Sequence, residues 1–178
     1  MAPVSRTKGQ GLLLGEWACL GILYPAPAHG FAIAARLKPT GDIGRVWSLT
    51  RPLTYRSLDL LTERGFVHAV GEERGIAGGT RTILAATRPG RAQLRAWLQA
   101  PVEHLRDLRS ELLLKLVLAE NCGIDVSAML AAQHEHIADL AAGLDANAAA
   151  ADPADAVAIW RSESAHAALR FLDRIRSA

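Results

Sequence analysis

The chain has 178 residues, half of which are hydrophobic, and its formal net charge is only +2. This length and composition suffice for one domain with a real core, or one domain with a substantial appendage, and exclude a disordered segment. No apolar run reaches the roughly 18–20 residues that cross a bilayer, so we expect a cytoplasmic protein without a membrane span.

The start of the chain is basic and residues 11–24 are apolar, a combination that resembles a secretory signal peptide. Glu16 interrupts the apolar stretch and no small-residue cleavage site follows it, so we expect no such signal. Cys19 and Cys122 lie about a hundred residues apart in apolar helical contexts. They lack the close spacing of zinc and redox sites, and we expect ordinary core residues and no metal or cofactor.

The charge is unevenly distributed along the chain. Residues 1–101 contain 13 Lys and Arg against 6 Asp and Glu, a net charge of +7, whereas residues 102–178 contain 7 against 12, a net charge of −5. A basic half joined to an acidic half indicates that only the first half faces a polyanion. Chance clustering of solvated charges is the alternative, and the order of elements along the chain decides between the two.

Two helices are predicted first. The apolar residues 12–23 indicate a buried helix, which Pro25 and Pro27 end because proline cannot donate a helix hydrogen bond. A second, short helix is expected over residues 29–37, with Pro39 beyond its end.

The third predicted helix covers residues 51–64. Thr50 is its expected N-cap, Pro52 lies in the first turn where a missing donor costs little, and Gly65 is suited to a left-handed C-terminal cap.

A β-hairpin is predicted next, because the periodicity changes. Residues 66–73 and 80–86 are rich in small and β-branched residues, and a glycine-containing turn separates them. Thr87 then caps a helix that extends to about Leu98. Three helices followed by a hairpin is the order of a winged helix-turn-helix, in which the hairpin forms the wing.

The fold class is therefore mainly α, with a winged helix-turn-helix domain over residues 1–100 and an all-helical dimerisation region over residues 101–178. In that region Pro101 is expected to start a helix to about Asn121. Asp125 is expected to cap a second helix, on which apolar residues recur at alternating spacings of four and three. The members of this seam are Val126, Leu130, Gln133, Ile137, Leu140 and Leu144.

The last predicted helix extends to about Arg176, with Asp152 as N-cap and Pro153 in its first turn. Its apolar residues near one face are Val157, Trp160, Ala168, Phe171 and Ile175. Three long amphipathic helices attached to a small domain have too few partners to bury all their apolar faces, which favours a homodimer. A monomer whose helices fold back onto the winged domain is the alternative. The predicted dimerisation residues are Leu112, Leu116, Leu130, Ile137, Leu140, Leu169 and Leu172.

The third helix of a helix-turn-helix enters the major groove of DNA, and its N-terminal residues meet the bases. The candidates here are Arg51, Thr54, Tyr55 and Arg56, which lie in the first turns. Arginine can pair two donors with guanine, whereas Thr and Tyr more often hold phosphates. The alternative is that they are solvated side chains beside a packed helix.

Further candidates for DNA contact lie outside the third helix. Arg74 and Arg81 flank the glycines of the wing, where they suit minor-groove or backbone contact. Arg45 lies in the loop before the third helix, and Lys8 belongs to a basic N-terminal arm.

Four short segments, in the same order, resemble PadR-type regulators. They are residues 20–37 (LGILYPAPAHGFAIAARL), residues 55–67 with YRSL and LTERGFV, residues 87–91 (TRPGR), and residues 101–116 with RD and ELLLKL. The last of these is similar to the first C-terminal helix of the longer PadR subfamily. Together they cover about residues 12–120, and the remainder is similar only in length and helical character.

This resemblance implies a dimeric repressor that binds double-stranded DNA at a near-palindromic operator through its winged helix, and whose C-terminal helices pair the subunits. It also implies a small-molecule effector, often aromatic or phenolic, that releases the DNA. Two features differ from the family pattern. The third helix begins with Arg51-Pro52-Leu53-Thr54 where smaller residues are usual, and the second wing strand lacks the usual tyrosines.

Candidates for an effector site are the scarce aromatic residues. Trp160 and Trp17 offer flat stacking surfaces, and His166 lies near Trp160 in sequence and suits a carboxylate or hydroxyl. The alternative is that both tryptophans are core residues. His134 and His136 are two residues apart on a helix, hence on different faces, and we expect no shared metal.

An enzyme and a protein-binding module are the two other classes of function. The sequence has no phosphate loop, nucleophile elbow or HExxH motif, so we expect no enzyme. A winged-helix module that binds proteins without touching DNA is the second alternative, and salt-sensitive DNA binding discriminates it from a regulator.

Overall fold

The computed structural model describes residues 11–74, 79–150, 152 and 154–177. The chain divides into two compact units, Met1–Arg91 and Ala92–Ala178. The division falls inside helix α4 (Arg88–Leu98), whereas the boundary predicted at residue 100 lies just after that helix. None of the helices in the described residues is long and apolar enough to cross a membrane.

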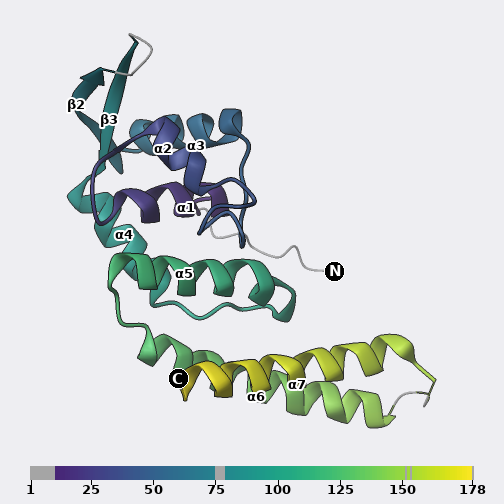
Figure 1. Ribbon diagram of the computed structural model, residues 1–178. Helices are drawn as coiled ribbons and strands as arrows, with labels where there is room; N and C mark the ends of the chain where they lie inside the picture. Colours follow the sequence, from purple (N-terminus) through teal and green to yellow (C-terminus); the bar gives the residue numbers. More distant parts are fainter. Residues whose placement is uncertain (1–10, 75–78, 151, 153, 178) are drawn as a thin grey trace. The chain divides into compact units, whose positions relative to one another are not determined.

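The first unit consists of three helices and a small antiparallel sheet, with strand β3 between β1 and β2 (Figure 1). Strands β2 and β3 form the hairpin, whose register pairs Val67 with Ala86 at one end and Arg74 with Thr80 at the other. The predicted winged helix-turn-helix is therefore confirmed. Its elements are α1 (Leu14–Leu23), β1 (Ala28–His29), α2 (Gly30–Arg36), α3 (Arg51–Glu63), β2 (Val67–Arg74) and β3 (Thr80–Ala86).

Helix α1 forms the centre of this unit, because nearly every one of its residues is buried. Cys19 belongs to that core, and burial raises the pKa of its thiol to about 12, which makes it an inert packing residue, as predicted. The buried Glu16 carboxylate lies 3.5 Å from the Arg64 guanidinium at the end of α3 and accepts a hydrogen bond from the backbone N–H of Leu13. This ion pair ties the start of α1 to the end of α3.

Residues 87–91 lock the base of the hairpin to the helices. The Thr87 hydroxyl donates to the carbonyl of Gly65 and accepts from the backbone N–H of Gly90, and so it caps α4 as predicted. A Cβ on Gly90 would lie 2.2 Å from the carbonyl oxygen of Phe66, so only glycine fits there. The Arg91 guanidinium donates to the Tyr24 carbonyl and lies over the Tyr24 ring. The Thr-x-x-Gly-Arg motif therefore stabilises the junction between the hairpin and the helices.

The caps of α3 agree with the sequence in part. Gly65 follows the helix with a φ of 70°, the left-handed conformation that was predicted for it. Thr50 occupies the N-cap position as predicted, but its side chain makes no capping hydrogen bond.

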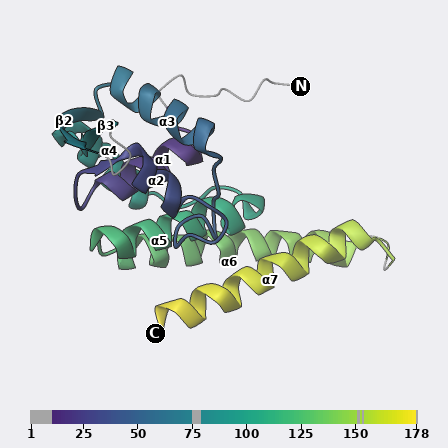
Figure 2. The same cartoon turned by 45° about the horizontal axis from the view of Figure 1, so that its top comes forward.

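The second unit contains two long antiparallel helices, α6 and α7, which lie side by side (Figures 1 and 2). Before them the chain forms a 3-10 turn, a π-helical turn and a short α-helix. The bounds are η1 (Leu105–Asp107), η2 (Leu108–Leu112), α5 (Leu113–Cys122), α6 (Ser127–Ala150) and α7 (Ala156–Arg176).

Two predicted helix starts are wrong. Residues 101–104 are not helical, and regular α-helix begins only at Leu113, because the backbone of this segment is held by side chains of α6 instead of by its own turn. Helix α7 begins at Ala156, and its N-cap is Asp155, whose carboxylate accepts from the backbone N–H groups of Val157 and Ala158. Asp152, the predicted cap, accepts from Ala154 in the turn before it.

Gln133, the polar member of the predicted seam, is fully buried and binds the backbone of the segment that follows α4. Its amide accepts from the N–H of Val102 at 2.6 Å and donates to the carbonyl of Val102 at 3.0 Å. The buried Lys115 ammonium donates to the carbonyl of Ala100, lies 3.0 Å from Glu111 and lies over the Trp97 ring. These side chains explain why the segment is extended instead of helical.

The side chains predicted to pair two subunits pack largely inside one copy. Leu112, Ile137 and Leu172 belong to the core of the second unit and have no exposed surface, so they hold the helices of one chain together and cannot themselves contact a second copy. This part of the predicted dimerisation set is corrected. The remaining members, which are partly buried against the same core, are Leu116, Leu130, Leu140 and Leu169.

Of the five apolar residues predicted near one face of α7, Ala168 and Ile175 pack against the core of the second unit, and the other three are exposed in the single chain. Ala165 and Leu172 are the buried residues of α7, because they are the ones turned toward α6. Val157, Trp160 and Phe171 are 66%, 73% and 37% exposed.

Three polar contacts between described side chains join α6 to α7. The His134 and Asp173 side chains approach to 3.0 Å, and nearer the turn Asp145 accepts from the Ser162 hydroxyl at 2.5 Å and contacts His166 at 2.9 Å. The hydrogen bond from Ser162, joined by His166, holds the pKa of Asp145 below its usual range.

Candidate functional site

The exposed face of α3 carries three of the four side chains that were predicted to contact DNA. Arg51, Tyr55 and Arg56 are exposed and lie in the first two turns. Thr54 is fully buried, and its hydroxyl donates to the carbonyl of Thr50. Thr54 therefore has no surface with which to touch DNA, and its predicted role is corrected to packing.

Three elements of the first unit meet at one aromatic side chain. Phe31 lies at the start of α2 with 47% of its surface exposed. The guanidinium of Arg51, from α3, lies 5.7 Å from its ring centroid, and that of Arg81, from β3, lies 5.3 Å from it. Arg51 also lies 5.6 Å from the centroid of the Tyr55 ring. The sequence-predicted Arg51, Tyr55 and Arg81 are thus brought together, around a phenylalanine that the sequence does not single out.

His29 and Gly30 complete this cluster. The Nδ1 atom of His29 accepts from the backbone N–H of Ala32, which caps α2, and its Nε2 atom lies 4.0 Å from Glu73 on the wing. A Cβ on Gly30 would lie 2.8 Å from the Tyr55 ring, so glycine allows that ring to lie against the backbone of α2. The His-Gly-Phe sequence therefore positions Tyr55 and the two arginines.

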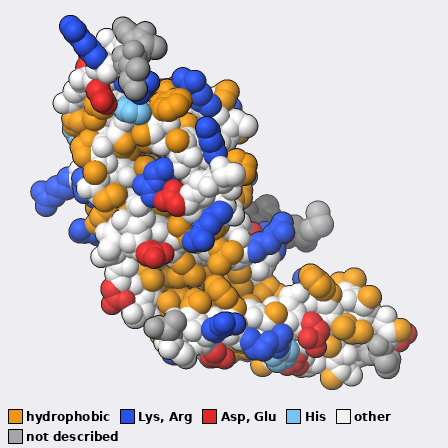
Figure 3. Space-filling view, in the orientation of Figure 1, with side chains coloured by type: hydrophobic (Ala, Val, Ile, Leu, Met, Phe, Trp, Pro, Cys, Tyr) orange, Lys and Arg blue, Asp and Glu red, His pale blue; other side chains and the backbone are white. Residues whose placement is uncertain are grey.

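A cleft of about 1000 Å³ lies between α3 and the wing, with Arg51, Tyr55 and Arg81 among its lining residues. Its two carboxylates on α3, Asp59 and Glu63, lie further along the helix than Arg51. Figure 3 shows basic and hydrophobic side chains next to one another on the surface of this unit. The arrangement suits a polyanion at the Arg51 end of the cleft.

The other predicted DNA contacts are not among the residues that line this cleft. Arg74 is exposed at the end of β2, and Arg45 is exposed in the loop between α2 and α3. Lys8 lies outside the described residues.

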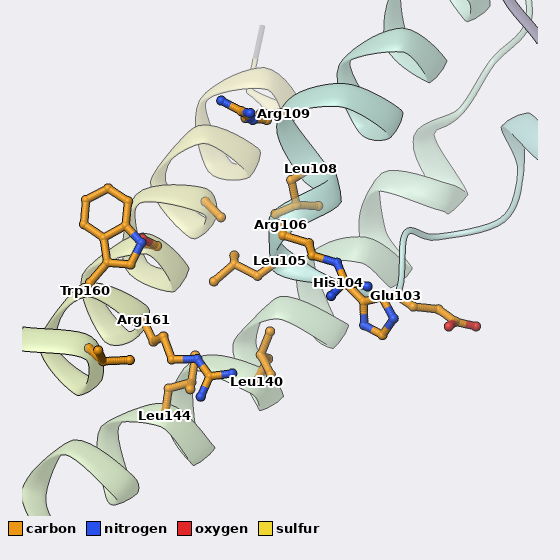
Figure 4. A pocket seen from close by; sticks show the side chains of 13 residues that line it. Glu103, His104, Leu105, Arg106, Leu108, Arg109, Leu140, Leu144, Trp160 and Arg161 are labelled. Carbon is orange, nitrogen blue, oxygen red and sulfur yellow. The ribbon is translucent and has the colours of Figure 1, made fainter. Parts of the chain in front are cut away.

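The second unit has a groove of about 850 Å³ between the η1–η2 turn and the α6–α7 hairpin (Figure 4). Trp160 lines it, together with apolar side chains that include Leu105, Leu140 and Leu144. The basic residues among its lining are His104, Arg106, Arg109 and Arg161, and the acidic one is Glu103.

The three predicted effector residues do not form one site. Only Trp160 lines the groove, whereas His166 faces Asp145 on α6. Trp17 is buried in α1 of the first unit, 7% exposed, and acts as core. Sequence reasoning missed Arg106, Arg109 and Arg161, because Arg161 of α7 comes to line the same groove as Arg106 and Arg109 only in the folded unit. Within the described residues no group of three or more His, Cys, Asp or Glu could hold a metal ion.

No protein-family model and no curated protein sequence matches this chain. Solved structures do. Bacillus subtilis PadR in complex with operator DNA is 17% identical, with a TM-score of 0.47, over 91% of this chain and 96% of that one. The complex of the same PadR with p-coumaric acid is 18% identical, with a TM-score of 0.41, over 95% and 97%. The PadR-like transcriptional regulator BC1756 from Bacillus cereus is 18% identical, with a TM-score of 0.41, over 97% and 98%.

The chain is similar to PadR and PadR-like regulators, the family that its sequence motifs resemble.

Proposed function

We propose that this protein is a sequence-specific DNA-binding transcriptional regulator that acts as a homodimer in the cytoplasm. The observation that carries the proposal is the pair of arginines at the cleft between α3 and the wing. Among the described residues neither Arg51 nor Arg81 has a carboxylate partner, and both are held on the Phe31 ring. Unpaired guanidinium groups on the two elements with which a winged helix meets DNA suit a phosphate backbone.

Hydroxyl-radical footprinting of the DNA immediately upstream of the protein's own coding sequence tests this function. A dimer that places one α3 in each of two successive major grooves protects two half-sites about 10 base pairs apart. Arg51→Ala weakens the protection of both half-sites, and Arg170→Ala, which removes an exposed arginine from α7, leaves it intact. The absence of any footprint with the wild-type protein, on this DNA and on a random-sequence library, favours the protein-binding winged-helix module instead.

The homodimer part of the proposal rests on α7. Val157 and Ile159 expose 66% and 49% of their surface on this helix. A group of large apolar side chains exposed near one end of a helical hairpin is costly in water and is a usual mark of an interface between proteins. A second copy of the chain carries the same surface, so pairing the two copies buries the exposed side chains of each.

Light scattering coupled to size-exclusion chromatography tests the dimer. The wild-type protein is expected at twice the mass of the chain, and Ile159→Lys at a lower apparent mass. Phe31→Lys, an equally drastic change at an exposed position of the first unit, is the matched control and leaves the mass unchanged. A wild-type monomer contradicts the proposal.

We further propose that the groove of Figure 4 takes a small anionic effector with an aromatic ring. Trp160 offers a stacking surface, and Arg106, Arg109 and Arg161 supply cations for a carboxylate. A thermal-shift screen of aromatic carboxylic acids tests it: the acids that bind stabilise the wild-type protein and leave Arg161→Ala unchanged. Ligands that stabilise both proteins equally bind elsewhere.

A further inference from the structure

The exposed ring of Phe31 is an unusual neighbour for two cations. An aromatic face attracts a guanidinium group, and each such contact is weak at an exposed site. Here one ring serves both Arg51 of α3 and Arg81 of β3, at 5.7 Å and 5.3 Å from its centroid. The ring therefore gathers two positive charges from elements that are separate in sequence.

Gathering two cations on one ring has an electrostatic cost, because like charges repel. Among the described residues no carboxylate forms an ion pair with Arg51 or Arg81 that would offset it. Glu73 is the cross-strand neighbour of Arg81 in the hairpin, but its carboxylate lies 4.0 Å from His29 and forms no ion pair with Arg81. An anion that binds beside the ring would offset this repulsion, and a phosphodiester is an anion whose geometry a guanidinium group matches.

The place of the two arginines in the fold points to a particular part of DNA. Arg51 is the first residue of α3, the helix that enters the major groove, and Arg81 lies in the wing, which meets the minor groove or the backbone beside it. Between a major groove and the next minor groove lies one strand of sugar-phosphate backbone. A group shared by α3 and the wing faces that strand.

We infer that Phe31, Arg51 and Arg81 form a single binding unit for neighbouring backbone phosphates of DNA, in which Phe31 is the positioning residue that holds both guanidinium groups. This inference rests on the proposed DNA-binding function and refines it, because it assigns Arg51 to phosphates and not to guanine. Tyr55, which contacts Arg51 and lies against Gly30, supports the same unit from α3.

A double-mutant cycle in DNA binding, measured by fluorescence anisotropy, tests the inference. Phe31→Leu keeps the apolar bulk but loses the aromatic face, and we expect it to weaken binding by about 5- to 30-fold, from two exposed cation–π contacts. Phe31→Tyr keeps the face and binds within about twofold of wild type. In an Arg51→Ala/Arg81→Ala background, Phe31→Leu changes nothing further. An equal loss in both backgrounds overturns the inference.

Two further measurements distinguish a positioning role of Phe31 from a role in folding, and a phosphate contact of Arg51 from a base contact. Leu13→Ala, another exposed apolar residue of the first unit, is the matched control, and thermal melting reports whether each variant is folded. Arg51→Ala is expected to weaken binding to operator and to random DNA by the same factor, as loss of a phosphate contact does. A loss confined to the operator means that Arg51 reads a base, and it overturns the assignment.

Nuclear magnetic resonance distinguishes failure of this inference from failure of the proposed function. Inorganic phosphate is titrated into the ¹⁵N-labelled full chain, and the arginine Nε–Hε signals are followed. We expect the Arg51 and Arg81 signals to shift together in the wild-type protein and in Phe31→Tyr, but not in Phe31→Leu. If this holds while no DNA is bound, the phosphate unit stands and the DNA-binding function fails. If DNA is bound without coupling to Phe31, the function stands and the inference fails.

Discussion

Neighbouring positions in the first turns of α3 have opposite environments, which decides which side chains are available for DNA. Thr54 is buried and bonded to the carbonyl of Thr50, whereas Tyr55 and Arg56 are exposed. A sequence shows that all of them are polar, but it does not show which of them points inward. The sequence-based assignment of Thr54 to DNA is wrong for that reason.

Thr54→Val tests the buried role at a single residue. The change keeps the shape of the side chain and removes one hydroxyl donor, so we expect a loss of about 1 kcal/mol in the free energy of unfolding and no change in DNA affinity. Arg56→Ala is the counterpart, with unchanged stability and weaker DNA binding. Urea denaturation and fluorescence anisotropy measure the two properties. If folded Thr54→Val binds DNA more weakly than wild type, Thr54 contacts DNA and the packing role is wrong.

Gln133→Leu tests the buried amide of the second unit. It leaves both the N–H and the carbonyl of Val102 without their partner, and we expect a loss of about 2–4 kcal/mol in the free energy of unfolding. Glu135→Leu, an exposed position of α6, is the control and costs little. Urea denaturation measures both. If the two variants are equally stable, Gln133 does not hold the Val102 segment in place.

At the scale of elements, periodicity and turn residues predicted well the helices and strands whose hydrogen bonds are local. The first three helices, the hairpin and the left-handed cap at Gly65 agree with the sequence. The starts of α5 and α7 differ from the prediction, because side-chain hydrogen bonds to the backbone replace the expected first turn there. Gln133 binds Val102 from 31 positions away, which no local pattern reveals.

Gly90→Ala tests the junction between the wing and α4. The added Cβ meets the carbonyl oxygen of Phe66 at 2.2 Å, and because that atom is backbone, the hairpin base has to move. We expect a lower melting temperature and weaker DNA binding. Gly143→Ala, where a Cβ meets nothing within 4 Å, is the matched control and leaves both unchanged. If the two variants behave alike, the junction tolerates displacement.

Asp145→Asn tests the contact between α6 and α7 through its pH dependence. The pKa of Asp145 is lowered in the folded chain, mainly by the Ser162 hydroxyl, so the folded state binds the proton less well than the unfolded state does. The carboxylate therefore stabilises the fold at neutral pH, and this contribution is lost as the pH falls through the folded-state pKa. In thermal melts the variant is expected to be less stable than wild type at neutral pH and equal to it in acid. A difference that persists in acid has another cause.

At the scale of the whole molecule, the chain combines a basic winged-helix unit with an acidic helical one. The charge asymmetry and the order of elements predict from sequence alone that the first half faces a polyanion. Two features required the folded chain. The groove lined by Arg106, Arg109 and Arg161 collects residues from separate segments, and the ring of Phe31 joins two arginines that lie 30 positions apart.

The most direct test of DNA binding through α3 and the wing is equilibrium binding to the DNA upstream of the protein's own coding sequence, over a series of salt concentrations. We expect wild type to bind this DNA more tightly than random DNA and to weaken steeply with salt, as release of counterions from phosphates requires. Arg51→Ala is expected to lower the slope of log K against log salt by about one, and Arg170→Ala to leave it unchanged. Wild-type affinity equal to that for random DNA, or equal slopes for wild type and Arg51→Ala, contradicts DNA recognition through α3 and the wing.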